Sequence, residues 1–266
     1  MIGNPVCVAA TGDVCGEGAV WHSAHHAVYW TDINRFLIHR LNLGDSSVRT
    51  WLFDEPVTAL SLTDREDVLA VVLGSQVILW EPALDIRRDP IFRLDEWPKV
   101  RLNDARCDPR GSLWIGSMRN NVNTDGSSSE VGGNDGILIR VDPDAKVTSW
   151  RQGVAISNER PFLEGFARGF PDGSAVDSEG YLWNCRFYGS CIVRVAPDGT
   201  IDRVVDMPVQ NITTCTFGGS GLTTLFVTTA SADSPRGDRL AGSLFSIQTN
   251  ILGQPENRFC FFGRGQ

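Results

Sequence analysis

The stretch Asp108-Pro-Arg-Gly-Ser-Leu-Trp114 returns in closely similar form as Asp177-Ser-Glu-Gly-Tyr-Leu-Trp183, and this repeat decides the fold. In both copies the Asp and the Gly favour a turn, and the Leu-Trp pair begins an apolar run typical of a β-strand. Similar short apolar runs extend along the whole chain, and long stretches with helical periodicity are missing. The sequence therefore predicts an all-β protein of many short antiparallel strands.

The most similar apolar runs recur at nearly regular distances along the chain. Their centres lie 41, 43, 69 and 43 residues apart, at Trp30, Val71, Trp114, Trp183 and Phe226. A period of about 40 to 50 residues in an all-β chain is typical of the four-stranded blades of a β-propeller, and a sandwich with irregular hairpins is the alternative. The 69-residue interval is too long for one period and too short for two, so part of a blade is expected to be missing there.

Composition and charge exclude several classes of protein. The chain has 266 residues, a formal net charge of -8 and a pI of about 5.0, which argues against nucleic acid and against anionic membrane surfaces as partners. No apolar run is long enough to span a membrane, and the N-terminus does not resemble a secretory signal. The seven cysteines never form a Cys-x-x-Cys pair, so we expect reduced thiols and a cytoplasmic protein.

Three oxygen-bearing residues suggest a metal site. Glu17 lies between two glycines, Asn158 follows Ile-Ser, and Asp172 lies between Pro and Gly. Two carboxylates and one amide oxygen form a donor set for a hard cation such as Ca²⁺, or for Zn²⁺ in an oxygen-rich site, with Mn²⁺ or Mg²⁺ as further possibilities. The competing interpretations are a solvated strand-end carboxylate for Glu17 and a simple turn residue for Asp172.

Two further residues suggest recognition of a polyhydroxylated substrate. Arg101 and Asn103 are two positions apart on a predicted strand, so both side chains are expected on the same face. A guanidinium beside a carboxamide suits the hydroxyls and ring oxygen of a sugar lactone, and the alternative for Arg101 is a surface cation. No Gly-x-Ser-x-Gly elbow is present, and the four histidines, all within the first forty residues, are expected in turns and on the surface.

These segments occur together and in order, and in this the chain resembles the regucalcin/gluconolactonase (senescence marker protein-like) family of six-bladed β-propeller lactonases. The segments that carry the resemblance are Gly16-Glu-Gly-Ala-Val-Trp21, Arg101-Leu-Asn-Asp-Ala-Arg-Cys-Asp-Pro-Arg-Gly111, Gly136-Ile-Leu-Ile-Arg-Val-Asp142, Gly153-Val-Ala-Ile-Ser-Asn158, Pro171-Asp-Gly-Ser-Ala-Val-Asp-Ser-Glu-Gly-Tyr-Leu-Trp183 and Ala241-Gly-Ser-Leu-Phe245. The resemblance implies a single propeller domain over residues 1–266, with six four-stranded antiparallel blades.

The chain departs from the family pattern directly after Asn158. That residue is followed at once by Glu159-Arg160-Pro161, whereas the family has a Gly and then about three more strands, most of a blade. One blade is therefore expected to be shortened after Asn158. Such a loss would leave exposed sheet edges or force the neighbouring blades to rearrange.

The resemblance also implies the function and the roles of the site residues. Glu17, Asn158 and Asp172 would bind one divalent cation, Arg101 and Asn103 would bind the substrate, and Asp172 would act as the catalytic base. The implied reaction is the metal-dependent hydrolysis of a sugar lactone, a step of carbohydrate metabolism in which an aldonolactone opens to an aldonic acid.

Two other interpretations stay open at the level of sequence. The chain is either this enzyme, a non-catalytic calcium-binding or interaction propeller, or a deletion form with impaired activity. Arg101 and Asn103 favour the enzyme, because a simple ion binder would not need them. The expected partner is a small sugar lactone, with no nucleic acid and no membrane, and the expected assembly is a monomer or a weak homo-oligomer.

Overall fold

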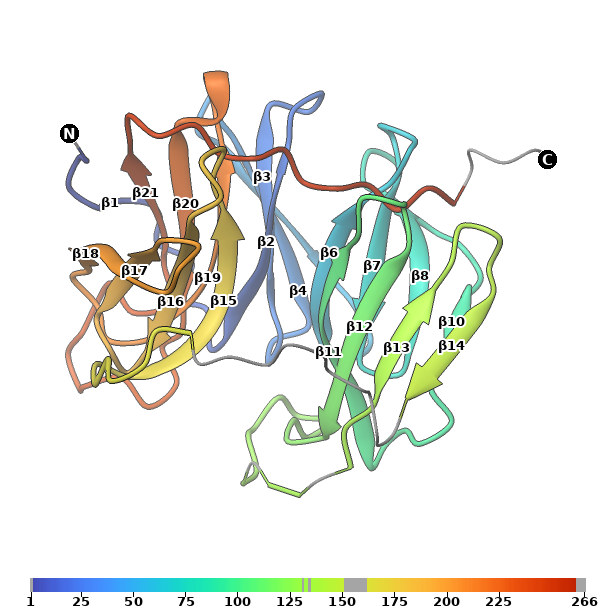
Figure 1. The fold of residues 1–266 in the computed structure, drawn as a ribbon. Helices are drawn as coiled ribbons and strands as arrows, with labels where there is room; N and C mark the ends of the chain where they lie inside the picture. Colours follow the sequence, from blue (N-terminus) through green and yellow to red (C-terminus); the bar gives the residue numbers. More distant parts are fainter. Residues whose placement is uncertain (1, 131, 134, 151–161, 262–266) are drawn as a thin grey trace. The chain divides into compact units, whose positions relative to one another are not determined.

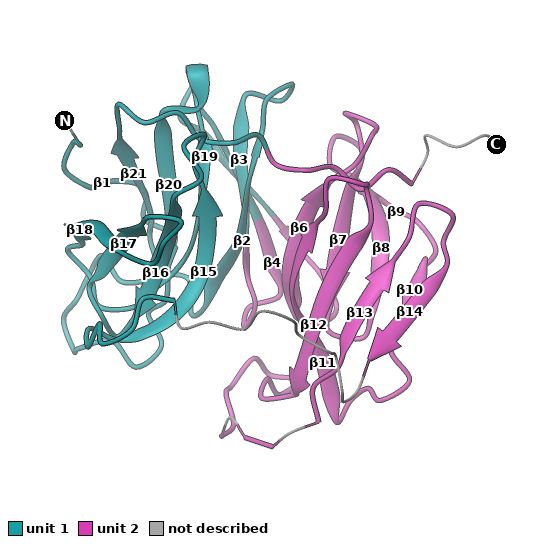
Figure 2. Ribbon diagram, viewed as in Figure 1, with its two compact units in different colours: residues 1–30, 39–50, 156–255 teal, residues 31–38, 51–155, 256–266 magenta. Residues whose placement is uncertain are grey.

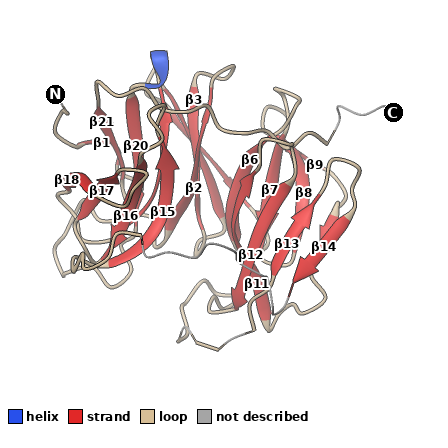
Figure 3. Ribbon diagram, in the orientation of Figure 1, coloured by secondary structure: helices blue, strands red, loops and turns tan. Residues whose placement is uncertain are grey.

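The computed structural model describes residues 2–130, 132–133, 135–150 and 162–261. This part of the chain folds into five antiparallel sheets, and its one helical element is the short 3-10 helix η1 (Ser220–Leu222), as Figures 1 and 3 show. The first two sheets are β2 (Gly16–His22), β3 (Ala27–Asp32), β4 (Leu37–Asn42) and β5 (Val48–Leu52), and then β6 (Val57–Leu62), β7 (Leu69–Leu73) and β8 (Gln76–Glu81) with the short β9 (Ile86–Arg87) and β10 (Phe92–Arg93). The next two are β11 (Val100–Cys107), β12 (Leu113–Arg119), β13 (Leu138–Val141) and β14 (Val147–Trp150), and then β15 (Phe170–Val176), β16 (Leu182–Phe187), β17 (Cys191–Val195) and β18 (Ile201–Asp206). The last sheet combines β1 (Val6–Ala9) with β19 (Ile212–Gly218), β20 (Thr224–Thr229) and β21 (Leu244–Gln248).

The number of sheets corrects one expectation. A six-bladed ring is wrong for the described residues, which form five sheets. The reason lies in the long interval of the sequence: β14 ends at Trp150 and β15 begins at Phe170, which leaves too few residues between them for four further strands. The sheets before and after the interval each keep four strands, and the predicted shortening directly after Asn158 lies outside the described residues.

The repeated Asp has the same structural role in both copies of the turn. Asp177 Oδ1 accepts the backbone N–H of Glu179 and Tyr181, and its Oδ2 accepts Trp183 Nε1–H at 2.9 Å. The carboxylate of Asp108 does the same for residues 110, 112 and 114. One carboxylate thus holds the tight turn and fixes the indole of the next strand. This is why the sequence repeats the residue types at this spacing.

The N-terminal strand completes the last sheet. β1 pairs with β21, with Val6 opposite Ser246 and Cys7 opposite Phe245. β21 continues to β20 and β19, so the outer strand of this sheet comes from the start of the chain and the other three from its end. Closure of this kind is typical of propellers, because it covers a sheet edge that would otherwise be exposed.

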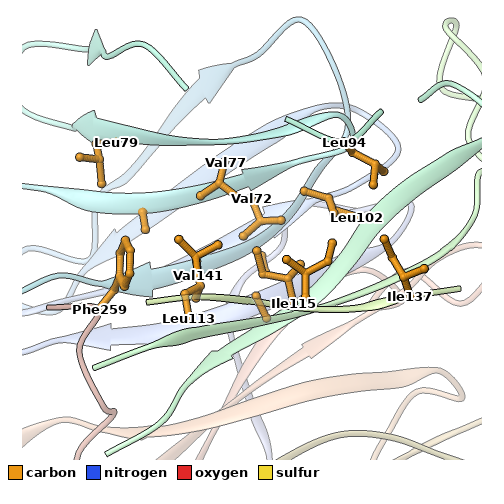
Figure 4. Packing of buried hydrophobic residues seen from close by; sticks show 14 of the residues in the cluster. Val72, Val77, Leu79, Leu94, Leu102, Leu113, Ile115, Ile137, Val141 and Phe259 are labelled. Atoms are coloured by element: carbon orange, nitrogen blue, oxygen red, sulfur yellow. The ribbon is translucent and has the colours of Figure 1, made fainter. Parts of the chain in front are cut away.

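The chain divides into two compact units (Figure 2). Unit 1 comprises residues 1–30, 39–50 and 156–255, and unit 2 comprises residues 31–38, 51–155 and 256–266. In unit 2 the core is one cluster of mostly branched aliphatic side chains, among them Val72, Leu102, Leu113 and Val141, with Phe259 against them (Figure 4). Unit 1 has a core around Trp183, Phe217 and Phe245 and a second cluster around Trp30 and Trp21.

Both cores depend on fully buried aromatic and aliphatic side chains, and each such side chain contributes about 1.5–3 kcal/mol through removal from water.

All seven cysteines are free thiols, as the sequence predicted. Within the described residues, no helix has the length and apolarity needed to cross a membrane.

Candidate functional site

Glu17 and Asp172 lie on two strands of unit 1 that flank a third. Glu17 is on β2 and is half-buried, whereas Asp172 is on β15 and is exposed. β19 packs against both β2 and β15, so the strands that carry the two carboxylates share one neighbour. Two residues more than 150 positions apart in the sequence are thereby brought into one region of the unit.

The carboxylates of Asp172 and Glu17 both contribute to the electrostatic field at the buried thiol of Cys185. Burial raises the pKa of the Cys185 thiol well above its usual value, and the neighbouring Cys215 thiol and the negative charges of Asp172 and Glu17 raise it further. The placement of the two carboxylates on strands that share the neighbour β19 agrees with this effect.

A β-bulge positions Asp172. In the pairing of β15 with β16, Pro171 lies opposite Arg186 and Ser174 lies opposite Asn184, so that Asp172 and the following Gly together face Cys185 alone. The buried Asn184 holds this irregular segment, since its Nδ2 donates to the Asp172 carbonyl at 2.9 Å and to Ser174 Oγ at 3.0 Å. Bulges re-aim side chains, and they are frequent beside active sites.

Gly173 is required at this bulge because β19 approaches it closely. A Cβ at this position would lie 2.2 Å from Thr214 Oγ1 and 2.9 Å from the Thr213 carbonyl oxygen. On the other side of β19, Thr213 Oγ1 donates a short hydrogen bond to the carbonyl of Gly16, the residue before Glu17. The two threonines, both buried, thus set the spacing of β2 and β15 around β19. Both threonines were missed by the sequence analysis, because nothing in the chain separates Thr213-Thr214 from other polar residues.

In unit 2, the buried Arg101 and the half-buried Asn103 form a polar cluster. Arg101 is only 4% exposed, so the interpretation as a surface cation is wrong. Its Nη1 donates to Asn103 Oδ1 at 2.6 Å, and its Nε and Nη2 donate to Asn121 Oδ1 at 3.1 and 2.9 Å. The structure therefore brings the two predicted substrate-binding residues into direct contact.

Sequence reasoning missed Asn121. This residue follows β12 within a polar stretch rich in Asn and Ser, and in the sequence alone it has no feature that separates it from its neighbours. Its carboxamide oxygen accepts two N–H groups of the Arg101 guanidinium, which fixes the plane of that group. Asn103 and Asp104 form a bulge of the same kind as the one at Asp172, because together they face Gly116 of β12.

The expectation that the four histidines lie in turns and on the surface is partly wrong. His22 and His39 are buried, at 1% and 3% exposure. His39 Nε2 lies 3.1 Å from Asp13 Oδ1, and Trp30 Nε1 donates to the other oxygen of the same carboxylate. His39 thus takes a position beside a Trp and an Asp that resembles the one Arg194 takes beside Trp183 and Asp177. This network is structural and supplies no metal cluster.

The residues present fit a divalent cation in their chemistry. Glu17 and Asp172 supply two carboxylates from strands that both pack against β19, and the third predicted ligand, Asn158, lies outside the described residues. Within the described residues no group of three or more His, Cys, Asp or Glu side chains could hold a metal ion. An oxygen-only set of two carboxylates, completed by an amide and by water, is typical of hard cations.

The order and pairing of the sheets define an all-β propeller. The chain belongs to the SMP-30/Gluconolactonase/LRE-like family, whose model matches residues 15–162 and 155–231. The match breaks into two overlapping pieces at residues 155–162, where the sequence predicts the loss of strands.

Relatives of known activity match along nearly their whole length. The chain is 29% identical to the pentonolactonase XacC of Haloferax volcanii, over 91% of this chain and 94% of the relative. It is also 29% identical to an L-arabinolactonase of Azospirillum brasilense, over 99% and 98%. The latter alignment extends over 303 positions, more than the 266 residues of this chain, so the relative has residues that this chain lacks.

A solved structure supports the fold. Regucalcin from Agrobacterium tumefaciens strain C58, described as a calcium-binding protein, superposes with a TM-score of 0.83 at 21% identity, over 95% of this chain and 96% of the other. The likeness at this identity establishes the β-propeller fold.

Proposed function

We propose that this protein hydrolyses a sugar lactone to the corresponding aldonic acid with the help of one divalent cation. The observation that carries the proposal is the placement of Glu17 and Asp172 on two strands that both pack against β19, in a chain of the SMP-30/Gluconolactonase/LRE-like family. Relatives named for the hydrolysis of pentonolactones and arabinolactone support the substrate class. The seven free thiols and the net charge of -8 are in keeping with a cytoplasmic enzyme that is a monomer or a weak homo-oligomer.

Glu17, Asn158 and Asp172 would hold the cation. The candidates are Ca²⁺ and Zn²⁺, with Mn²⁺ or Mg²⁺ as further possibilities, since all accept carboxylate and amide oxygens. When bound, a divalent cation supplies Lewis-acid polarisation of an ester carbonyl.

The protein side chains account for the remaining steps. Asp172 would accept a proton from the attacking water while the water oxygen bonds to the lactone carbonyl carbon. The bond between that carbon and the ring oxygen then breaks, and the ring oxygen takes up the proton to become a hydroxyl. Arg101 and Asn103 would bind the sugar hydroxyls, and Asn121 keeps the guanidinium in a fixed plane.

Acid release from gluconolactone in weak buffer tests the reaction. We expect the rate to exceed spontaneous hydrolysis, to fall to the spontaneous rate with a chelator, and to return on addition of Ca²⁺, Zn²⁺, Mn²⁺ or Mg²⁺. If acid release never exceeds the spontaneous rate with any of these ions, the enzymatic proposal fails. Cation binding measured by calorimetry without any acid release would instead establish a non-catalytic ion binder.

Asp172→Asn tests the proposed base. We expect a loss of at least about 100-fold in kcat, because the carboxylate that takes up the proton is removed while the side-chain volume is kept. The matched control is Asp198→Asn, a change of the same chemistry at the exposed turn before β18, where Asp198 accepts the N–H of Thr200. Undiminished turnover in Asp172→Asn would remove this residue from the mechanism.

A further inference from the structure

Unit 2 contains a cavity of about 300 Å³ that has no role in the proposed reaction so far. Its volume is at the lower end of the range for small-molecule sites and suits a single ring. The walls come from the turn after β3, the loops that precede β6 and β11, and the segment after β12. Its aromatic and polar lining residues include Phe36, Asp54, Glu55, Trp97, Asn120 and Asn123.

Trp97 supplies a fixed aromatic face. Its six-membered ring lies so close to Gly74 that a Cβ there would be 2.7 Å from Trp97 Cζ3, so the absence of a side chain at Gly74 leaves the space that the indole occupies. Gly74 is itself fixed, since its carbonyl accepts the N–H of Leu102 at 2.9 Å. Leu102 lies between Arg101 and Asn103, so the indole and the substrate-binding pair rest on one hydrogen-bonded frame.

The cavity is continuous with the Arg101 cluster along the chain. Asn120 lines the cavity, and Asn121, the next residue, binds the guanidinium of Arg101. Trp97 and Pro98 also line the cavity, four and three residues before Arg101, and the carbonyl of Lys99 accepts the N–H of Asn120 at 2.9 Å. This part of the cavity wall therefore lies close in sequence to Arg101 and to its partner Asn121.

The polar groups of the cavity suit a neutral, hydroxyl-rich ligand. Glu55 is already engaged, because its carboxylate accepts Ser75 N–H at 2.7 Å, Ser75 Oγ–H at 2.9 Å and Gln76 Nε2–H at 2.9 Å. Asp54 remains exposed as an acceptor, and the two asparagines add amide groups. Among the described residues that line the cavity there is no Lys or Arg, so an anionic ligand is disfavoured.

We propose that this cavity is a second sugar subsite, and that the preferred substrate is the lactone of a disaccharide aldonic acid whose non-lactone ring stacks on Trp97. An aromatic face beside amide and carboxylate groups binds a pyranose by contact with its apolar face and hydrogen bonds to its hydroxyls. This proposal rests on the proposed lactonase function, because Arg101 and Asn103 would bind the lactone ring of the same molecule.

The test compares kcat/KM for cellobionolactone and gluconolactone in the full-length protein. We expect the wild type to favour cellobionolactone, and Trp97→Ala to lower this preference by about tenfold while gluconolactone hydrolysis stays within about twofold. Trp97→Phe keeps an aromatic face and should retain most of the preference. A Trp97→Ala variant that keeps the preference, or loses activity on both lactones equally, overturns the subsite.

Trp150→Ala provides the matched control. Trp150 is a half-buried tryptophan of the same unit that stacks on Trp114 and does not line the cavity, so its removal should leave the preference unchanged.

A second readout separates the two proposals. If the wild type hydrolyses neither lactone, the proposed function fails. Saturation-transfer NMR with cellobiose then decides the subsite: a signal abolished by Trp97→Ala supports it, and no signal in the wild type overturns it.

Discussion

The carboxylate of Asp108 accepts the backbone N–H of Arg110 and Ser112 and the indole N–H of Trp114. Burial opposes its ionisation, but these hydrogen bonds and the positive charge of Arg110 favour the anion, and the pKa of Asp108 lies below its usual value. A folded-state pKa below the unfolded one stabilises the protein above the unfolded pKa, and this contribution is lost as pH falls through the folded pKa.

Asp108→Asn therefore has a pH-dependent cost. We expect a loss of about 1 kcal/mol in the free energy of unfolding at neutral pH, because one hydrogen bond to a charged acceptor is lost at a partly solvated position. The difference from the wild type should begin to shrink as pH falls below about 4, where the unfolded carboxyl takes up a proton, and should be smallest below the lowered folded-state pKa, where both states are protonated. Urea unfolding at several pH values measures this, and a difference that is constant with pH would contradict the role of the charge.

β11, β15 and β19 share one kind of irregularity, and further one-residue register shifts occur in β1, β6 and β18. β11, β15 and β19 each place two residues opposite one on the next strand, at Asn103–Asp104, Asp172–Gly173 and Thr213–Thr214. Two of these bulges carry residues that the sequence predicted as functional. The regular alternation of a strand gives no indication of a bulge, which is why the threonines were missed.

Gly173→Ala tests the element that positions Asp172. Because the new Cβ would meet Thr214 at 2.2 Å and the backbone of Thr213, β15 must move away from β19, and we expect a loss of about 1–3 kcal/mol in stability together with reduced lactone hydrolysis. The control is Gly132→Ala, since a Cβ there has no atom within 4 Å. Thermal unfolding and acid release measure both effects, and a Gly173→Ala protein equal to the wild type in both would show that the close approach is unimportant.

For the whole molecule, the sequence predicted the class of fold but not the number of sheets. The Asp-x-x-Gly-x-Leu-Trp repeat has a local cause, one carboxylate that holds a turn and an indole, and so it is readable from the chain alone. The placement of Glu17 and Asp172 in one unit depends on the packing of β19 against both of their strands, and the Arg101 cluster depends on Asn121. Contacts between residues far apart in the sequence produce no periodic pattern. The candidate site residues were therefore predicted from the family resemblance and not from their spacing.

The prediction of a single domain over residues 1–266 implies cooperative unfolding of both compact units. Leu113→Ala in unit 2 and Phe245→Ala in unit 1 each remove a fully buried side chain, at a cost of about 2–5 kcal/mol. We expect each variant to shift one common transition, seen equally by circular dichroism and by tryptophan fluorescence. Two separate transitions, each shifted by only one of the variants, would show that the units unfold independently.

The pairing of β1 with β21 has a consequence for synthesis on the ribosome. Ser246, the partner of Val6, is translated 240 residues after it, so β1 has no hydrogen-bonded neighbour in the nascent chain until β21 has been made. A nascent strand with open N–H and C=O groups is a target for chaperones and for misassembly with other chains. The last sheet can be completed only after Leu244–Gln248 has been synthesised, which makes this strand decisive for the yield of native protein.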